Sequence, residues 1–188
     1  EEGGEKALAR VPRDPGGKFY MGVAEELGIV KIAPDIDPRW PVFGVTADQA
    51  DAYCEWKSRV TGMRYRLPST REWEKAARGA DGRWFPWGDR FDWTFAKGAL
   101  SRAGEPLPEP VGAFVSDLSP YGVRDLAGGV HEWTSDWWIR ARNIRYICGG
   151  SWISAEVSSF RAAGRIGWET SHVAHSLGFR VVRELPKR

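Results

Sequence analysis

The sequence of 188 residues is poor in several features, and each shortage excludes a class of protein. It has only two cysteines, Cys54 and Cys148, too few for a disulfide framework or a structural zinc site built on cysteines. No apolar run reaches the roughly 20 residues that a membrane-spanning helix needs. The formal charge of +2 is too small to favour binding to nucleic acid or to an acidic membrane. We therefore expect no nucleic-acid partner and no membrane segment.

The side-chain amides are also scarce, since Asn143 is the one asparagine and Gln49 the one glutamine. Proteins from hot environments contain few of these thermolabile residues. The shortage therefore predicts a thermophilic source, or else reflects a genome rich in G and C.

Glycine and tryptophan, by contrast, are abundant. The chain has 22 glycines and 11 tryptophans, whereas glycine averages roughly 7% in proteins. The glycines are scattered between aromatic residues, which favours tight turns and irregular loops packed on large flat side chains. With 42% hydrophobic and 28% charged residues, the composition is that of a globular domain rather than a disordered chain.

Start and stop signals define two helices in the first half of the chain. Thr46 with Gln49, and Ser69 with Glu72, have the spacing of capping boxes. Glycines at positions 62 and 79 stand where each helix should end. We therefore predict helices over residues 46–62 and 69–79.

The rest of the chain has the signature of strands and loops. Short strands are predicted at 16–22, 145–152, 158–166 and 177–184, the last from the alternation in LGFRVVRE. Residues 1–15 are charged and rich in glycine and proline, and we expect a flexible lead-in there. The predicted organisation is a single α+β domain over 16–188, with two helices early and short twisted antiparallel strands late.

The stretch DLAGGVHEWTSDWW, residues 125–138, combines two adjacent glycines with three tryptophans and several titratable groups. We predict a structural role for it. Trp133, Trp137 and Trp138 should supply most of the apolar burial, and Glu132 and Asp136 should accept hydrogen bonds from buried backbone and indole N–H groups.

Six segments, in order, resemble the formylglycine-generating enzyme (sulfatase-modifying factor) family: GGKFYMG, YRLPSTREWEKAARG, WFPWGD, YGVRDLAGGVHEWTSDWW, CGGSW and LGFRVVRE. The resemblance runs from about residue 16 to residue 184. It implies a variant of the C-type lectin fold with little regular structure, in agreement with the composition.

Two departures from the family pattern bear on chemistry. The resemblance implies two copper-binding cysteines after the Gly-Gly-Ser-aromatic motif, but Ser154 and Ser159 stand at those places. A serine hydroxyl cannot replace the soft thiolate that copper(I) needs, so we expect no catalytic residues and no enzyme activity. The resemblance also implies that structural calcium can bind near residues 128–133. There Gly129 replaces an asparagine and removes one oxygen ligand, although Glu132 remains. We therefore expect no metal site and no cofactor.

Variable proteins of diversity-generating retroelements share this fold and end in a similar frame, which this chain keeps as GGSW and LGFRVV. This resemblance implies a variable ligand-binding cassette, residues 143–180, displayed to a macromolecular partner that we expect to be a protein. Within it, Phe160, Arg161 and Arg165 should form a fixed frame. The residues predicted to bind ligand are Tyr146, Cys148, Ile153, Ser154, Val157, Ser158, Gly164, Ile166, Thr170, Ser171, His172 and His175.

Other interpretations of the same residues remain open. His172 and His175 have a metal-binding spacing, but no third ligand is near in sequence, and exposed loop histidines explain them as well. The serines lack the nucleophile elbow of a hydrolase. The chain could instead be a family relative that is catalytically inactive or has an unidentified oxidase-type activity. A calcium-dependent sugar lectin would need motifs that EPLPEP, residues 105–110, does not supply.

Overall fold

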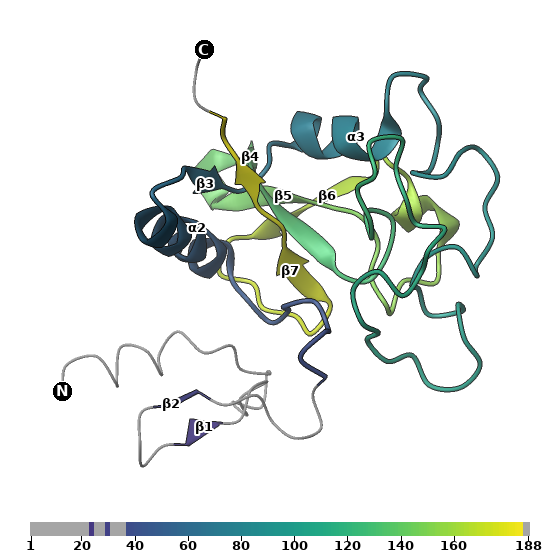
Figure 1. Ribbon diagram of the computed structural model, residues 1–188, viewed down its shortest axis with the longest axis horizontal. Coiled ribbons are helices and arrows are strands. Elements are labelled where there is room, and N and C mark those ends of the chain that lie inside the picture. Colours follow the sequence, from purple (N-terminus) through teal and green to yellow (C-terminus); the bar gives the residue numbers. More distant parts are fainter. Residues whose placement is uncertain (1–22, 25–28, 31–36, 186–188) are drawn as a thin grey trace.

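The computed structural model describes residues 23–24, 29–30 and 37–185, and its centre is a four-stranded sheet with the order β6-β5-β4-β7 (Figure 1). These strands are β4 (His131–Ile139), β5 (Ile144–Cys148), β6 (Arg165–Glu169) and β7 (Leu177–Phe179). Strand β5 is antiparallel to both β4 and β6, as predicted. Strand β7 is parallel to β4, so the sheet is mixed.

Both predicted helices are confirmed, as α2 (Ala47–Thr61) and α3 (Thr70–Arg78). Each begins with a complete capping box. The side chain of the cap residue accepts from the backbone N–H of the third helical residue, whose own side chain accepts from the backbone N–H of the cap residue. Helix α2 ends at Gly62, whose φ of 68° is the left-handed conformation that glycine adopts without strain.

The two helices cover opposite faces of the sheet. Trp133 pairs with Ile147, and both belong to a buried cluster with Ala50 and Cys54 of α2. The neighbouring pair, Glu132 and Cys148, lies on the other face, because successive residues of a strand alternate. There Cys148 packs with Trp73 and Ala77 of α3. The sheet therefore has a separate apolar layer on each face, one under α2 and one under α3.

Several shorter elements complete the fold. Strand β3 (Tyr65–Arg66) pairs antiparallel with β8 (Val182–Arg183), and β1 (Val23–Ala24) pairs antiparallel with β2 (Ile29–Val30). Two 3-10 helices, η2 (Arg140–Arg142) and η3 (Val157–Phe160), lie in the second half.

The predicted segments at 158–166 and 177–184 need correction in detail. The first starts in η3 and a turn, and its strand begins only at Arg165. The second is two strands, β7 and β8, with a break at 180–181. The predicted strand at 16–22 and the lead-in at 1–15 lie outside the described residues.

Between α3 and β4 the chain is almost entirely irregular, as the loops on the right of Figure 1 show. This region is held together by aromatic packing. Phe85 and Phe160 are buried, with Trp87, Phe91 and Trp93 against them. Within the described part of the chain, no helix is both long enough and apolar enough to cross a bilayer.

Residues 125–138, predicted to be structural, form a loop that leads into β4, the longest strand. Trp133 is fully buried and donates from its indole to the carbonyl of Val45 at 2.9 Å. Trp138 is 51% exposed, so the prediction that it adds to the buried core is wrong. Trp137 is half-buried, with the guanidinium of Arg145 4.6 Å from its ring.

Candidate functional site

The acidic residues of β4 are held by hydrogen bonds, as predicted. The carboxylate of Glu132, 5% exposed, accepts from the indole of Trp73 at 2.7 Å and pairs with the guanidinium of Arg180 at 2.5 and 2.7 Å. Asp136 accepts from the backbone N–H and the hydroxyl of Thr70 at 2.9 and 2.6 Å. These carboxylates therefore join α3 and the C-terminal segment at Arg180 to the sheet.

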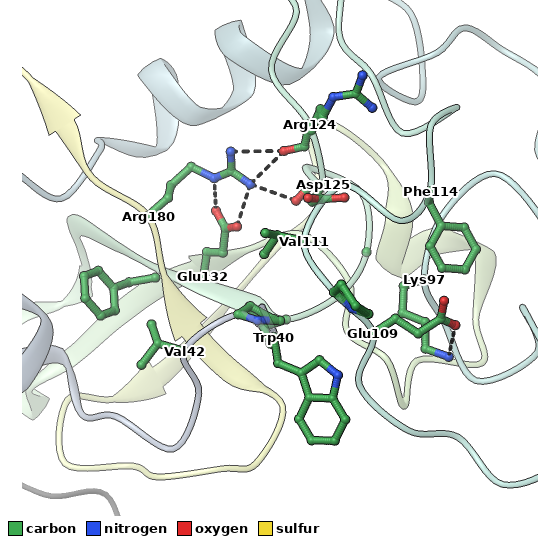
Figure 2. Close-up of a pocket in the computed structure, with 16 residues that line it drawn as sticks. Trp40, Val42, Lys97, Glu109, Val111, Phe114, Arg124, Asp125, Glu132 and Arg180 are labelled. Atoms are coloured by element: carbon green, nitrogen blue, oxygen red, sulfur yellow. Dashed lines mark hydrogen bonds and ion pairs between the residues drawn. The ribbon is translucent and has the colours of Figure 1, made fainter. Parts of the chain in front are cut away.

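Next to this ion pair lies a cavity of about 400 Å³ (Figure 2). Its apolar wall includes Trp40, Val42, Val111 and Phe114, and its charged residues include two ion pairs, Glu132 with Arg180 and Lys97 with Glu109. The Lys97 side chain is 8% exposed and its ammonium lies 3.1 Å from Glu109. The cavity can therefore accept a small organic molecule, but because its charged residues are of both signs it has no strong net charge.

Two aspartates at or near this cavity have raised pKa values. Burial raises the pKa of Asp117 to about 7, although its carboxylate accepts backbone N–H bonds from Ala127 and Gly128. Burial also raises the pKa of Asp125, whose carboxylate accepts from the backbone N–H of Gly112 at 2.7 Å. Asp125 has a positive φ of 55°, a conformation that aspartate adopts more readily than most residues.

The residues at 128–133 do not fit the calcium ion that the resemblance implies. Calcium takes six to eight oxygen ligands, but both oxygens of Glu132 already accept hydrogen bonds. Arg180 also donates to the carbonyls of Arg124 and Asp125, so a cation already occupies this group of oxygens. Among the described residues, no three His, Cys, Asp or Glu side chains are grouped to hold a metal.

The predicted ligand-binding residues differ in exposure. Three apolar ones are exposed, Ile153 at 43%, Val157 at 39% and Ile166 at 45%. Exposed polar ones are Ser158, Ser171, His172 and His175, and half-buried ones are Tyr146, Ser154, Gly164 and Thr170. Only Cys148, 3% exposed, is in the core.

Cys148 must therefore be removed from the predicted surface. It shares a face of β5 with Tyr146, but α3 covers that face at Cys148 through Trp73. Tyr146 lies further along and stacks on Trp138, with ring centroids 5.8 Å apart. Since Tyr146 pairs with Gly167 and Ile147 pairs with Ile166, Tyr146 and Ile166 lie on opposite faces of the sheet. The predicted residues thus do not all lie on one face of the sheet.

The turn between β6 and β7 is held against the sheet by ring contacts. His172 packs on Trp168 at 4.4 Å and His175 on Trp152 at 5.1 Å. Behind them His131 contacts Trp168, and its Nδ1 lies 2.6 Å from the carbonyl oxygen of Gly149. Burial lowers the pKa of His131. The two exposed histidines therefore pair with aromatic rings rather than with each other.

The predicted frame residues have intramolecular partners. Phe160 is fully buried. Arg161 lies over the ring of Trp84 at 4.2 Å, and Arg165 lies 3.8 Å from Glu74. These contacts fix the backbone on both sides of the exposed residues.

Neither cysteine is placed for thiolate chemistry. Burial raises the pKa of Cys54 to about 11 and that of Cys148 to about 12, and the two lie in different apolar clusters. Ser154 lies close to Ser151, with their hydroxyl oxygens 3.1 Å apart, and Ser159 belongs to η3.

The cavity was not predicted from the sequence. Its wall comes from segments around residues 40, 110 and 179, which share no spacing signal. Glu132 and Arg180 lie in quoted motifs, GGVHEW and LGFR, and could have indicated only one end of it.

Comparison with known proteins gives a family match over most of the chain. Residues 24–185 match the family described as sulfatase-modifying factor enzyme 1-like domain. The chain is 34% identical over 190 aligned positions to inactive C-alpha-formylglycine-generating enzyme 2 from Bos taurus. That alignment covers 94% of this chain and 56% of the relative, so the chain spans about half the length of this curated relative.

Two solved structures are similar to this fold. PvdO from Pseudomonas aeruginosa is 28% identical with a TM-score of 0.70, covering 82% of this chain and 66% of that one. Treponema denticola variable protein 1 is 18% identical with a TM-score of 0.71, covering 95% and 79%, a likeness of fold alone. Together with the family match, these similarities confirm the predicted α+β, C-type lectin-like fold.

Proposed function

The chain belongs to the sulfatase-modifying factor enzyme 1-like family, and from this premise we propose that it is a non-catalytic member that binds a protein ligand. In this proposal it is a variable protein of a diversity-generating retroelement, and the exposed residues of the variable cassette contact the ligand. The observation that carries the proposal is the division of the cassette into a fixed frame and exposed residues without fixed roles in the core.

The absence of a thiolate pair supports a non-catalytic role. Ser154 and Ser159 stand where the resemblance implies copper-binding cysteines, and a hydroxyl is a poor ligand for copper(I). The two cysteines that the chain has are buried, apart, and protonated at neutral pH. One curated relative, which is similar over 94% of this chain, is itself named inactive.

The arrangement of the cassette supports display. Ser151, Phe160, Ala162 and Leu177 are at most 1% exposed, and they alternate along the chain with exposed positions. Changes at exposed positions shift stability by at most about 0.5 kcal/mol in most cases. A surface of this kind can therefore change its contacts while the frame keeps its shape.

The chemistry of the exposed residues favours a protein ligand. The predicted set contains no Lys, Arg, Asp or Glu, so it lacks the cations that bind phosphate groups. Half-exposed Ile153, Val157 and Ile166 stand beside serines and histidines. Apolar anchors with adaptable hydrogen-bonding neighbours are the usual composition of protein-binding surfaces.

A display experiment tests the division between frame and surface without knowledge of the ligand. Ile153, Val157, Ser158 and Ser171 are randomised in one library, and Phe160, Ala162 and Leu177 in a second, with folding scored by protease resistance. We expect most members of the first library and few of the second to fold. Equal intolerance in both would overturn the display proposal.

The retroelement itself has a separate test. The DNA around the gene should encode a reverse transcriptase and a near-copy of the codons for residues 143–180 that differs at adenines. If the neighbouring DNA contains neither, the chain is an inactive family relative with an ordinary loop. Formation of formylglycine in a cysteine-containing sulfatase peptide would instead show that the chain is an enzyme.

A further inference from the structure

Strand β6 forms an open edge of the main sheet. The strand order β6-β5-β4-β7 places a neighbour on one side of β6 only. Arg165, Ile166 and Glu169 are exposed, and Gly167 and Trp168 are half-buried. An edge strand presents a row of backbone N–H and C=O groups that can pair with another strand.

The sequence of this strand is complementary to itself in the antiparallel direction. When two copies of Arg165-Ile166-Gly167-Trp168-Glu169 are aligned about Gly167, each Arg165 faces Glu169 of the other copy. Each Ile166 then faces Trp168, and the two glycines meet at the centre. Opposite charges and apolar pairs directly across from each other are the pairs that stabilise antiparallel strands.

We propose that β6 is a homodimer interface, in which a second copy of this chain adds its own β6 in antiparallel register about a two-fold axis at Gly167. A two-fold axis uses the same patch on both copies, so one self-complementary strand is sufficient. The main sheets of the two copies then form one continuous sheet. The proposal does not require ligand display by the cassette, and it assigns Ile166, one of the predicted ligand-binding residues, to the contact between copies.

The side chains around the axis suit such an interface. Ile166, 45% exposed, lies on the face of the sheet that α2 covers. On the other face Trp138 lies directly over Gly167, where an added Cβ would be 1.6 Å from the indole. Trp138 is 51% exposed and stacks on Tyr146. Apolar groups therefore flank the axis on both faces, with the charged pairs at the ends of the strand.

The charges also select the register. A parallel alignment would place each Arg165 against Arg165 of the other copy, and like charges across a ladder are destabilising. A shift by one residue would place Ile166 of the second copy and Trp168 of the first on opposite faces of the joined sheet. Arg165 contacts Glu74 at 3.8 Å within its own chain, but its side chain is 41% exposed and accessible to a partner.

The interface is small, because one short strand and its flanking side chains make it. Interfaces that bury less than about 1,200 Å² are usually transient. We therefore expect a monomer–dimer equilibrium that shifts with concentration in the micromolar range, rather than a permanent dimer.

Sedimentation velocity of the chain over that range tests the proposal by charge reversal. Arg165→Glu alone and Glu169→Arg alone each place like charges at both ends of the paired strands, and each should remain monomeric. An equimolar mixture of these two variants restores opposite charges at both ends and should dimerise. The double variant Arg165→Glu/Glu169→Arg should dimerise like the parent.

Arg90→Glu is the matched control, because it reverses an exposed arginine in a loop outside β6 and should leave the equilibrium unchanged. Circular dichroism confirms that each variant is folded, and hydrogen exchange should show concentration-dependent protection of the Ile166 to Trp168 amides. A parent that stays monomeric at every concentration would overturn the proposal. So would a dimer that survives Arg165→Glu, or a mixture of the single variants that fails to associate.

Discussion

Residues 125–138 and the exposed part of the cassette, residues 153–175, differ in how their polar groups are satisfied. In the first, Glu132 and Asp136 have intramolecular partners for their carboxylates. In the second, Ser158, Ser171 and His175 are exposed, and apolar side chains are half-exposed beside them. A motif rich in titratable groups can therefore be structural, whereas a segment with few such groups supplies exposed side chains that are available to a partner.

The largest expected effect comes from truncating the buried tryptophan of the first region. Trp133→Ala should lower the free energy of unfolding by about 3–5 kcal/mol, because it removes a fully buried aromatic side chain and leaves a cavity. Trp138→Ala is the control, and should cost only about 1 kcal/mol, the value of an exposed ring stack. Urea denaturation measures both. Equal losses would show that the two tryptophans are buried alike.

The buried ion pair should have the next largest effect. Glu132→Gln should cost about 3 kcal/mol, at the low end for breaking a buried pair, because the Arg180 side chain keeps 26% exposure. Asp37→Asn breaks the exposed pair with Arg39 and should not change the denaturation midpoint measurably. If Glu132→Gln were as neutral as Asp37→Asn, the network would not hold the fold together.

The buried carboxyl of Asp117 should make stability depend on pH. Its pKa of about 7 lies above the ordinary value of 3.8, so the folded state retains a proton that the unfolded state loses between these values. Its contribution to stability is complete below pH 3.8 and is lost as the pH rises through 7. The free energy of unfolding of the parent minus that of Asp117→Asn should therefore be more positive at pH 4 than at pH 8. Urea midpoints at the two pH values measure it. A difference independent of pH would contradict the raised pKa.

The smallest effect is expected in the cassette, where several changes should be nearly neutral together. Each exposed substitution shifts stability by at most about 0.5 kcal/mol, and separated sites add nearly independently. Calorimetry should therefore give a melting temperature close to that of the parent for the combined variant Ile153→Ser, Val157→Ser, Ser158→Ala, Ile166→Thr and Ser171→Ala. Collapse of the fold would assign these side chains to the core.

Local signals in the sequence predicted the helices well. Capping boxes at Thr46 and Ser69 are short-range patterns whose hydrogen bonds form within one turn, so they indicate where a helix begins without knowledge of the fold. The acceptor roles of Glu132 and Asp136 followed from the cost of burying an unpaired charge.

Features that depend on distant segments were not predicted. Strand β4 has register shifts after Trp133 and after Trp137, and these disturb the alternation by which a strand is recognised. Cys148 looked equivalent to Tyr146, since both lie on one face of β5, and only the position of α3 separates them. The cavity near Arg180 is formed by loops that no local pattern connects.

The two buried cysteines provide natural reporters of local opening. Cys54 belongs to α2 and is buried against the sheet, whereas Cys148 belongs to β5 and is buried under α3, on the opposite face of the sheet. A thiol reagent can reach each sulfur only after its own layer has opened, since buried segments of a protein open with different free energies. The rates of labelling at the two positions would therefore measure separately how often each helix leaves the sheet, in the native protein and without any mutation.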